Sequence, residues 1–204
     1  MSTVAARRIG LYGGAFDPPH LAHHSLAQAA IAQHALDALI ILPTGQAWHK
    51  SRHLTAAKHR LAMAQLGFCD VPQARIDPRE TLRNGVSYTF DTLTELKAEH
   101  PRAQLYLLMG EDQWRFFPQW HRYEEIAQNA TLLVALRADS MPAKGQNSSQ
   151  KQGKIQFLPI QMPASPISAT QIRQHCDQQL PIDHLVKPAV ARYIAENRLY
   201  QSTI

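Results

Sequence analysis

Glycines followed by closely spaced histidines lie near the start of the chain, in the run GGAFDPPHLAHH at positions 13–24. Gly13 and Gly14 let a ligand approach backbone N–H groups closely, because they carry no side chain. The histidines open an expected helix, whose start offers unpaired N–H donors and the positive end of the helix dipole. His20 and His23 are three residues apart, so they share one face of the first turn. The run therefore predicts a binding site for a polyphosphate.

Other uses of this run have less support. With 11 histidines in 204 residues, about 0.6 His-x-x-His pairs arise by chance, so the spacing alone decides nothing. A closed zinc site needs four ligands, and neither a cysteine pair nor the glutamate of an HExxH motif stands nearby. We therefore expect no metal bound by side chains. The run contains neither Gly-x-Gly-x-x-Gly nor Gly-Lys-Ser/Thr, which excludes a dehydrogenase fingerprint and a P-loop there.

A second candidate phosphate site is ISATQIR at positions 167–173, which follows two prolines. Ser168 is expected to cap a helix here. Exposed N–H groups, two hydroxyl groups and the guanidinium of Arg173 within one and a half turns suit the β- and γ-phosphates of ATP. On the residues alone, a capped surface helix without a ligand also explains the segment.

Short apolar runs alternate with amphipathic stretches along the chain. We expect buried strands at 9–12, 38–42, 105–109, 132–136 and 155–159. The clearest helices are 21–35, 56–66 behind a Thr55 cap, 89–99 and 123–128. Alternating strands and helices predict an α/β fold, a Rossmann-like parallel sheet with helices on both faces and ligands at the carboxyl ends of the strands.

The last third of the chain is more polar. Residues 139–154 contain two glycines, a proline and three lysines without apolar periodicity, which predicts an exposed, mobile loop. The loop is either a lid over phosphate or an insertion tolerated at the surface. Residues 168–176 and 188–200 predict C-terminal helices packed against one sheet edge.

Composition favours one soluble domain over residues 1–204. The chain is 45% hydrophobic, with 21 Lys and Arg against 16 Asp and Glu, so its surface is expected to attract anions. No window approaches the roughly 20 apolar residues that cross a bilayer. Cys69 and Cys176 lie far apart and form no CxxC pair, which fits a reduced, cytoplasmic setting.

The two phosphate segments together resemble the (T/H)xGH and ISxTxxR motifs of the nucleotidyltransferase superfamily. The resemblance implies that His20 and His23 face the phosphates of a bound nucleoside triphosphate. It implies ATP-binding roles for Gly13, Gly14, Ala15, Phe16, Ile167, Ser168, Thr170 and Arg173. Ala22 replaces the usual glycine and Ala15 the usual Thr or Ser. Alanine is favoured over glycine inside a helix by about 1 kcal/mol, so the Ala22 change is expected to be tolerated.

Three further stretches are similar to the bacterial nicotinate mononucleotide adenylyltransferases. SYTFDTL at 87–93 resembles SYT-x-DTL, and LMGED at 108–112 with Trp120 resembles GAD…W. The resemblance implies mononucleotide binding by Lys50, Ser87, Tyr88, Thr89 and Trp120, and ATP binding by Gly110, Asp112 and Arg137. Glu111 stands where alanine is usual. On the residues alone, Trp120 also fits a core aromatic, Asp112 a helix cap, and Lys50 a solvated loop side chain.

This resemblance implies transfer of the adenylyl group of ATP to nicotinate mononucleotide, giving deamido-NAD and pyrophosphate. Transfer is expected to be in line, without a covalent intermediate, and with Mg²⁺ bound through the ATP phosphates. The rival acceptors are phosphopantetheine, FMN and glycerol phosphate. A non-catalytic nucleotide sensor stays open, as does the oligomeric state. No nucleic acid partner is expected, since aromatic residues do not interleave with basic ones. No membrane partner is expected either.

Overall fold

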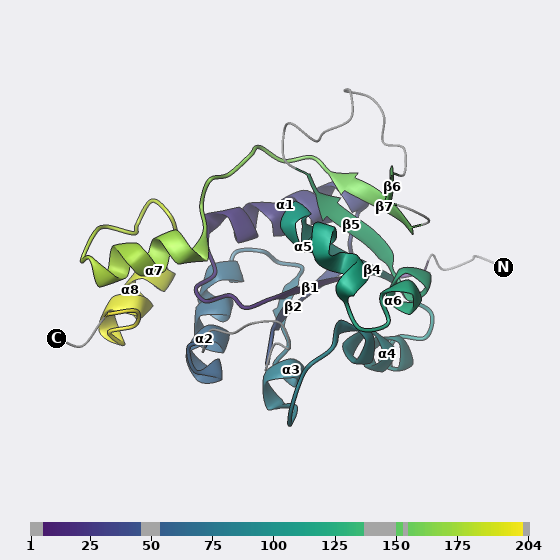
Figure 1. Cartoon of the computed structure of the whole chain (residues 1–204), viewed down its shortest axis with the longest axis horizontal. Coiled ribbons are helices and arrows are strands. Elements are labelled where there is room, and N and C mark those ends of the chain that lie inside the picture. Colours follow the sequence, from purple (N-terminus) through teal and green to yellow (C-terminus); the bar gives the residue numbers. More distant parts are fainter. Residues whose placement is uncertain (1–5, 46–53, 137–149, 153–154, 202–204) are drawn as a thin grey trace.

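A seven-stranded sheet forms the centre of the computed structural model, which describes residues 6–45, 54–136, 150–152 and 155–201 (Figure 1). The strands are β1 (Arg8–Gly14), β2 (Ala38–Pro43), β3 (Ala74–Ile76), β4 (Gln104–Gly110), β5 (Thr131–Ala135), β6 (Gln150–Gln152) and β7 (Ile155–Ile160). Their order is β3-β2-β1-β4-β5-β7-β6. Only β6 among them pairs antiparallel, with β7. The expected Rossmann-like parallel sheet is confirmed.

Helices cover both faces of the sheet, and their bounds are as follows. They are α1 (Leu21–His34), α2 (Ala57–Phe68), α3 (Arg79–Leu82), α4 (Thr89–Glu99), α5 (Glu111–Phe116), the 3-10 turn η1 (Phe117–Gln119), α6 (Tyr123–Asn129), α7 (Ala169–Asp177) and α8 (Pro188–Glu196). In Figure 1, α1 lies across the sheet from α4 and α6. Each helix in the described residues falls short of the length and apolar character needed to cross a bilayer.

Two apolar cores result from the alternation of side chains along the strands. Ile9 and Leu11 of β1 face the core that α4 and α6 complete. Tyr12 faces the other core, which α1 covers with Leu26. Gly10 lies on this second face, where an added Cβ atom would stand 2.8 Å from the Leu36 side chain. The strands are buried on both faces, which explains why they form nearly continuous apolar runs.

The position of the site follows from the strand order. From β1 the chain moves outward to β2 and β3, then returns to place β4 on the other side of β1. Between β1 and β4 the winding direction therefore reverses, and a crevice opens at the carboxyl ends of these two strands. The glycines at 13–14 end β1, and Gly110 ends β4.

Several local expectations are wrong. Thr55 does not cap α2; the N-cap is Ala56, without a side-chain hydrogen bond, and the Thr55 N–H instead donates to Asp17 Oδ2. The loop predicted over 139–154 contains strand β6, while 137–149 and 153–154 lie outside the described residues. The C-terminal helices α7 and α8 pack on α2 rather than on a sheet edge. Met63 of α2 lies in one apolar core with Ile172 of α7 and Val190 of α8.

Candidate active site

One cavity of about 1000 Å³ lies at the carboxyl ends of β1, β4 and β5. The N-terminal ends of α1, α4, α5 and α7 surround it. It is lined by every predicted site residue that the structure describes: Gly13, Gly14, Ala15, Phe16, His20, His23, Ser87, Tyr88, Thr89, Gly110, Asp112, Trp120, Ile167, Ser168, Thr170 and Arg173. Lys50 and Arg137, predicted from the same motifs, lie outside the described residues.

The two histidines lie side by side at the start of α1. His20 is the N-cap residue, and its backbone N–H donates to Nδ1 of His23 over 3.2 Å. Their rings stack with centroids 3.6 Å apart. Because Nδ1 of His23 accepts, a neutral His23 ring carries its proton on Nε2 and donates from there. The sharing of one face, expected from the spacing, is confirmed.

Burial distinguishes His20 from an ordinary surface histidine. It lowers the pKa of His20 to about 4, so the ring is neutral at pH 7. The His20 side chain lies in a capping box, in which it faces the backbone N–H of His23, and its Nδ1 is buried. With Nδ1 turned toward this N–H, the neutral ring carries its proton on Nε2, the nitrogen able to donate to a ligand oxygen.

Arg173 joins the second helix start to the first. Ser168 caps α7 by accepting the N–H of Gln171 over 3.2 Å, as expected. The Arg173 guanidinium donates to the backbone carbonyl of Asp17 over 2.9 Å and to the Thr170 hydroxyl over 3.0 Å. Two motifs separated by 156 residues thus meet at one wall of the cavity.

Arg60 fixes the loop that precedes the histidines, and the motif analysis missed it. Its side chain is buried and donates to the carbonyl oxygens of Ala15, Thr44 and Thr55 over 3.1, 2.7 and 2.8 Å. These bonds tie the loop after β1 to the segment after β2. A signal was present, because helical spacing puts Arg60 on the same buried face of α2 as Met63.

Aromatic side chains and a helix start form the other end of the cavity. Ser87, Tyr88 and Thr89 lead into α4, and Tyr88 contacts the ring of His121 with centroids 4.5 Å apart. Trp120 is partly buried, packs edge-on against Phe117 at 5.5 Å and also lines the cavity. Both readings of Trp120, as a core aromatic and as a cavity wall, therefore describe its position.

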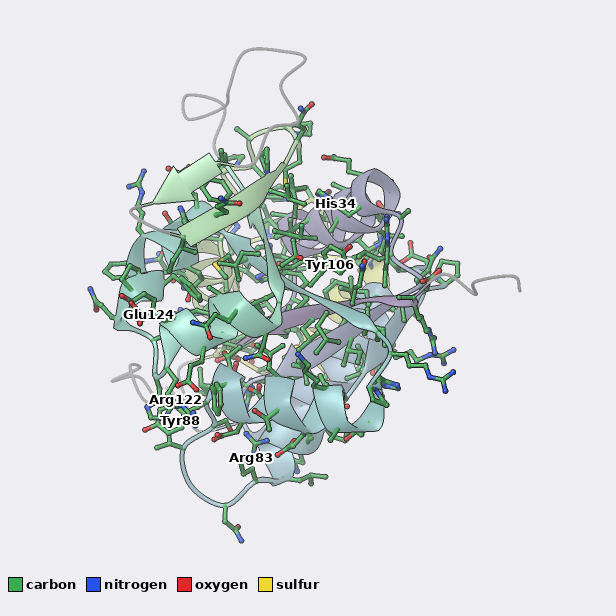
Figure 2. All side chains as sticks on the ribbon, turned by 90° about the vertical axis from the view of Figure 1, so that its right-hand side faces the viewer. His34, Arg83, Tyr88, Tyr106, Arg122 and Glu124 are labelled. Carbon is green, nitrogen blue, oxygen red and sulfur yellow. The ribbon has the colours of Figure 1, made fainter. Side chains whose placement is uncertain are left out.

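Packing between α4 and α6 supports this end of the cavity. The guanidinium of Arg122, the N-cap residue of α6, lies 3.7 Å from the centre of the Phe90 ring. Figure 2 labels Arg122 next to Tyr88 on this side of the molecule. The contact is a cation–π pair that joins the two helix starts.

Glu80 is a buried carboxyl group at this end, and motif reading missed it. Its Oε1 accepts the Thr92 hydroxyl over 2.9 Å, and its backbone carbonyl accepts the Ser87 hydroxyl over 3.0 Å. Burial raises the pKa of Glu80, although the Thr92 bond and the charge of Arg83 oppose the shift. Glu80 thereby holds both ends of the segment 87–92.

The helix after β4 does not begin with Asp112 as its cap, which the residues alone had allowed. Gly110 is the N-cap residue of α5, so Asp112 lies in the first turn and is not the cap. Glu111 is buried and pairs with Arg115 over 2.6 Å, which compensates the charge at this strand end. Among the described residues, no cluster of three or more His, Cys, Asp or Glu has the geometry to hold a metal ion.

Comparisons with known proteins place these features in a family. The cytidylyltransferase-like family model matches residues 11–175. A probable nicotinate-nucleotide adenylyltransferase of Albidiferax ferrireducens is 49% identical, covering 96% of this chain and 99% of that protein. The one of Methylibium petroleiphilum is 39% identical, covering 98% of this chain and 95% of that protein.

Solved structures share the fold. The nicotinic acid mononucleotide adenylyltransferase of Plasmodium falciparum complexed with NaAD has a TM-score of 0.74 at 18% identity, covering 95% of this chain and 97% of that chain. A putative nicotinate-nucleotide adenylyltransferase of Vibrio parahaemolyticus has a TM-score of 0.70 at 18% identity, covering 97% of each chain.

Proposed function

Because this chain belongs to the cytidylyltransferase-like family and, within it, to the nicotinate-nucleotide adenylyltransferases, we propose that its cavity joins ATP to nicotinate mononucleotide. The reaction transfers the adenylyl group of ATP to the phosphate of the mononucleotide. Its products are deamido-NAD, an intermediate of NAD biosynthesis, and pyrophosphate.

One observation carries the proposal: the Arg173 side chain reaches the loop that leads to His20. The starts of α1 and α7 therefore face one cavity, and both offer backbone N–H groups and positive dipole ends to an anion. A triphosphate suits this pair of helix starts, because its several anionic groups contact both at once.

The phosphate end is assigned to residues of both motifs. His20, as a neutral imidazole, and His23 donate hydrogen bonds, while the Ser168 and Thr170 hydroxyls and Arg173 hold the β- and γ-phosphates. Gly13 has open space around its α-carbon, since an added Cβ atom would meet nothing within 4 Å. The nucleotide is therefore able to approach the backbone at 13–16. Gly110 and Asp112 are assigned to the ATP side of the same cavity.

The acceptor end is assigned to α4 and Trp120. The amides of Tyr88 and Thr89 stand at a helix start, where N–H groups lack intrahelical acceptors and favour a carboxylate. The indole of Trp120 offers a flat surface for a pyridine ring. Lys50 and Arg137 stay predictions for phosphate and adenosine contacts.

The mechanism is placement and charge neutralisation. A phosphate oxygen of the mononucleotide attacks the α-phosphorus of ATP as the bond to the pyrophosphate oxygen breaks, in line and without an enzyme-bound intermediate. Imidazole and amide donors that meet the leaving pyrophosphate stabilise charge as it develops.

Mg²⁺ fits this site as a partner of the phosphates. The residues assigned to the phosphates supply imidazole, hydroxyl and guanidinium groups, which bind phosphate oxygens, while the carboxylates of Asp17 and Asp112 also line the cavity. His20, Thr170 and Arg173 would hold the triphosphate that carries the ion. When bound, Mg²⁺ would neutralise part of the phosphate charge.

The setting of the reaction is also a proposal. Cys69 and Cys176 are free thiols, which fits a reduced cytoplasm. The single domain expected over residues 1–204, and the absence of nucleic acid and membrane partners, stay predictions.

The test is pyrophosphate release from ATP and Mg²⁺ with nicotinate mononucleotide, compared with nicotinamide mononucleotide, FMN and phosphopantetheine. Nicotinate mononucleotide is expected to be the best acceptor, and deamido-NAD the product. Turnover only with FMN or phosphopantetheine would overturn the acceptor assignment. ATP binding without pyrophosphate release would instead indicate a nucleotide sensor.

A further inference from the structure

A buried carboxylate lies between the segment that follows α8 and the phosphate end of the cavity. Asp17 is 1% exposed, and its Oδ1 accepts the hydroxyl of Tyr200 over 2.7 Å. Its Oδ2 accepts the N–H of Thr55 over 3.2 Å. Its backbone carbonyl accepts the Arg173 guanidinium over 2.9 Å. One residue thus contacts both the C-terminal segment and the arginine assigned to phosphate.

Tyr200 is held firmly in this position. It follows α8, lies beyond the residues that the family model matches, and has a positive φ of 63°. Its hydroxyl also lies 3.8 Å from the sulfur of Met63. Burial, with the charge of Asp17, raises the pKa of Tyr200, while the charge of Arg173 acts in the opposite direction. The hydroxyl therefore stays protonated and donates to Asp17, and the charge of Arg173 is close enough to affect its pKa.

The Tyr200 hydroxyl contacts the carboxylate of Asp17, and the Arg173 guanidinium contacts the backbone carbonyl of the same residue. A carboxylate removed from water needs hydrogen bonds. When it loses one donor, one of its oxygens lacks a partner, and a nearby donor that moves to it lowers the energy. Arginine pairs with carboxylates strongly and in fixed geometry. Loss of the Tyr200 hydroxyl is therefore expected to let the Asp17 carboxylate compete with phosphate for the Arg173 guanidinium.

We propose that Tyr200 is a positioning residue whose hydroxyl holds the Asp17 carboxylate so that the Arg173 guanidinium stays directed to the phosphate end of the cavity. The inference rests on the proposed function for the identity of the phosphate ligand. It assigns the segment that follows α8 a role in binding triphosphate as well as in folding.

A matched control exists in the same region. The hydroxyl of Tyr193 on α8 pairs with Nδ1 of His59 on α2 at 2.9 Å. Neither Tyr193 nor Tyr200 is among the residues that line the cavity. Tyr193→Phe and Tyr200→Phe thus each remove one hydroxyl between the C-terminal segment and the body of the protein, but only the second removes a donor to Asp17.

The experiment compares the full-length variants by calorimetric titration with inorganic tripolyphosphate, by steady-state kinetics and by thermal unfolding. Tyr200→Phe is expected to weaken tripolyphosphate binding and raise the KM for ATP about tenfold, which is about 1.4 kcal/mol. The KM for nicotinate mononucleotide stays unchanged. Tyr193→Phe is expected to keep wild-type values for all ligands. Unchanged tripolyphosphate binding in Tyr200→Phe, or an equal loss in Tyr193→Phe, would overturn the proposal.

A double-mutant cycle with Asp17→Asn tests the route through the carboxylate. If Tyr200 acts through the charge of Asp17, Tyr200→Phe has little further effect on tripolyphosphate binding in the Asp17→Asn background. Additive losses would contradict that route. Tripolyphosphate binding needs no turnover, so it separates this proposal from the proposed function, which fails if the wild-type chain releases no pyrophosphate from ATP and nicotinate mononucleotide.

Discussion

His20 is expected to meet phosphate as a neutral imidazole. Burial lowers its pKa to about 4, so at pH 7 about one ring in a thousand is charged. Protonating it in the free protein at that pH costs about 4 kcal/mol, at about 1.4 kcal/mol per pH unit. A hydrogen bond to a charged partner contributes roughly 1.5–3 kcal/mol. The stacked ring of His23, with centroids 3.6 Å apart, further disfavours two adjacent cations.

The perturbation is His20→Asn, with His20→Ala beside it, and the assay is kcat/KM for ATP between about pH 5.5 and 8.5. The neutral amide of asparagine keeps one donor, so His20→Asn is expected to retain more activity than His20→Ala. Wild type and His20→Asn are expected to share one profile shape, because ATP itself titrates equally in both. A tenfold fall per pH unit above about pH 6.5, present in the wild type and absent from His20→Asn, would refute a neutral His20.

Three other substitutions probe separate parts of the account. His23→Ala is expected to lower kcat by roughly 10²-fold or more, since its contact strengthens as charge moves to pyrophosphate; a near-normal kcat in steady-state kinetics would count against this role. Trp120→Ala is expected to weaken binding of nicotinate mononucleotide and to preserve ATP binding in calorimetry; equal losses for both ligands would argue against ring stacking. Glu80→Gln keeps an acceptor for the Thr92 hydroxyl and removes a charge that burial disfavours. In the folded protein Glu80 keeps its proton to a higher pH than in the unfolded chain, where the ordinary pKa is 4.5. The stability of the wild type therefore falls as the pH rises above 4.5. The stability of Glu80→Gln relative to wild type should therefore rise between about pH 4 and 8 in urea unfolding; a constant or falling difference would contradict this assignment.

Much of the fold was predictable because its long elements have clear periodicity. The five strands expected from apolar runs, and helix 89–99 with its exact bounds, are present. Short elements were not predictable: β3 contains only Ala74–Ile76 and α3 only Arg79–Leu82, too few residues for a period of 2 or 3.6 to emerge. Strand β6 was missed because a polar edge strand has no apolar pattern.

Site residues that belong to a sequence motif were predictable. Site residues that act through contacts between distant segments were not. The motifs identified His20, His23 and Arg173, and the structure brings them to one cavity. The Asp17 contact with Tyr200 spans 183 residues, and no local pattern marks such a pair. Arg60 was overlooked for a different reason, because a charged residue on an apolar helix face is usually treated as an exception to the pattern.

The central claim is that the starts of α1 and α7 hold one triphosphate. The most direct measurement is a crystal structure of this chain with Mg²⁺ and the non-hydrolysable analogue α,β-methylene ATP. We predict that phosphate oxygens of a single bound analogue lie within hydrogen-bond distance of both the histidine pair at 20 and 23 and the guanidinium of Arg173. A triphosphate that contacts only one of these helix starts, with the other turned to solvent, would contradict the account.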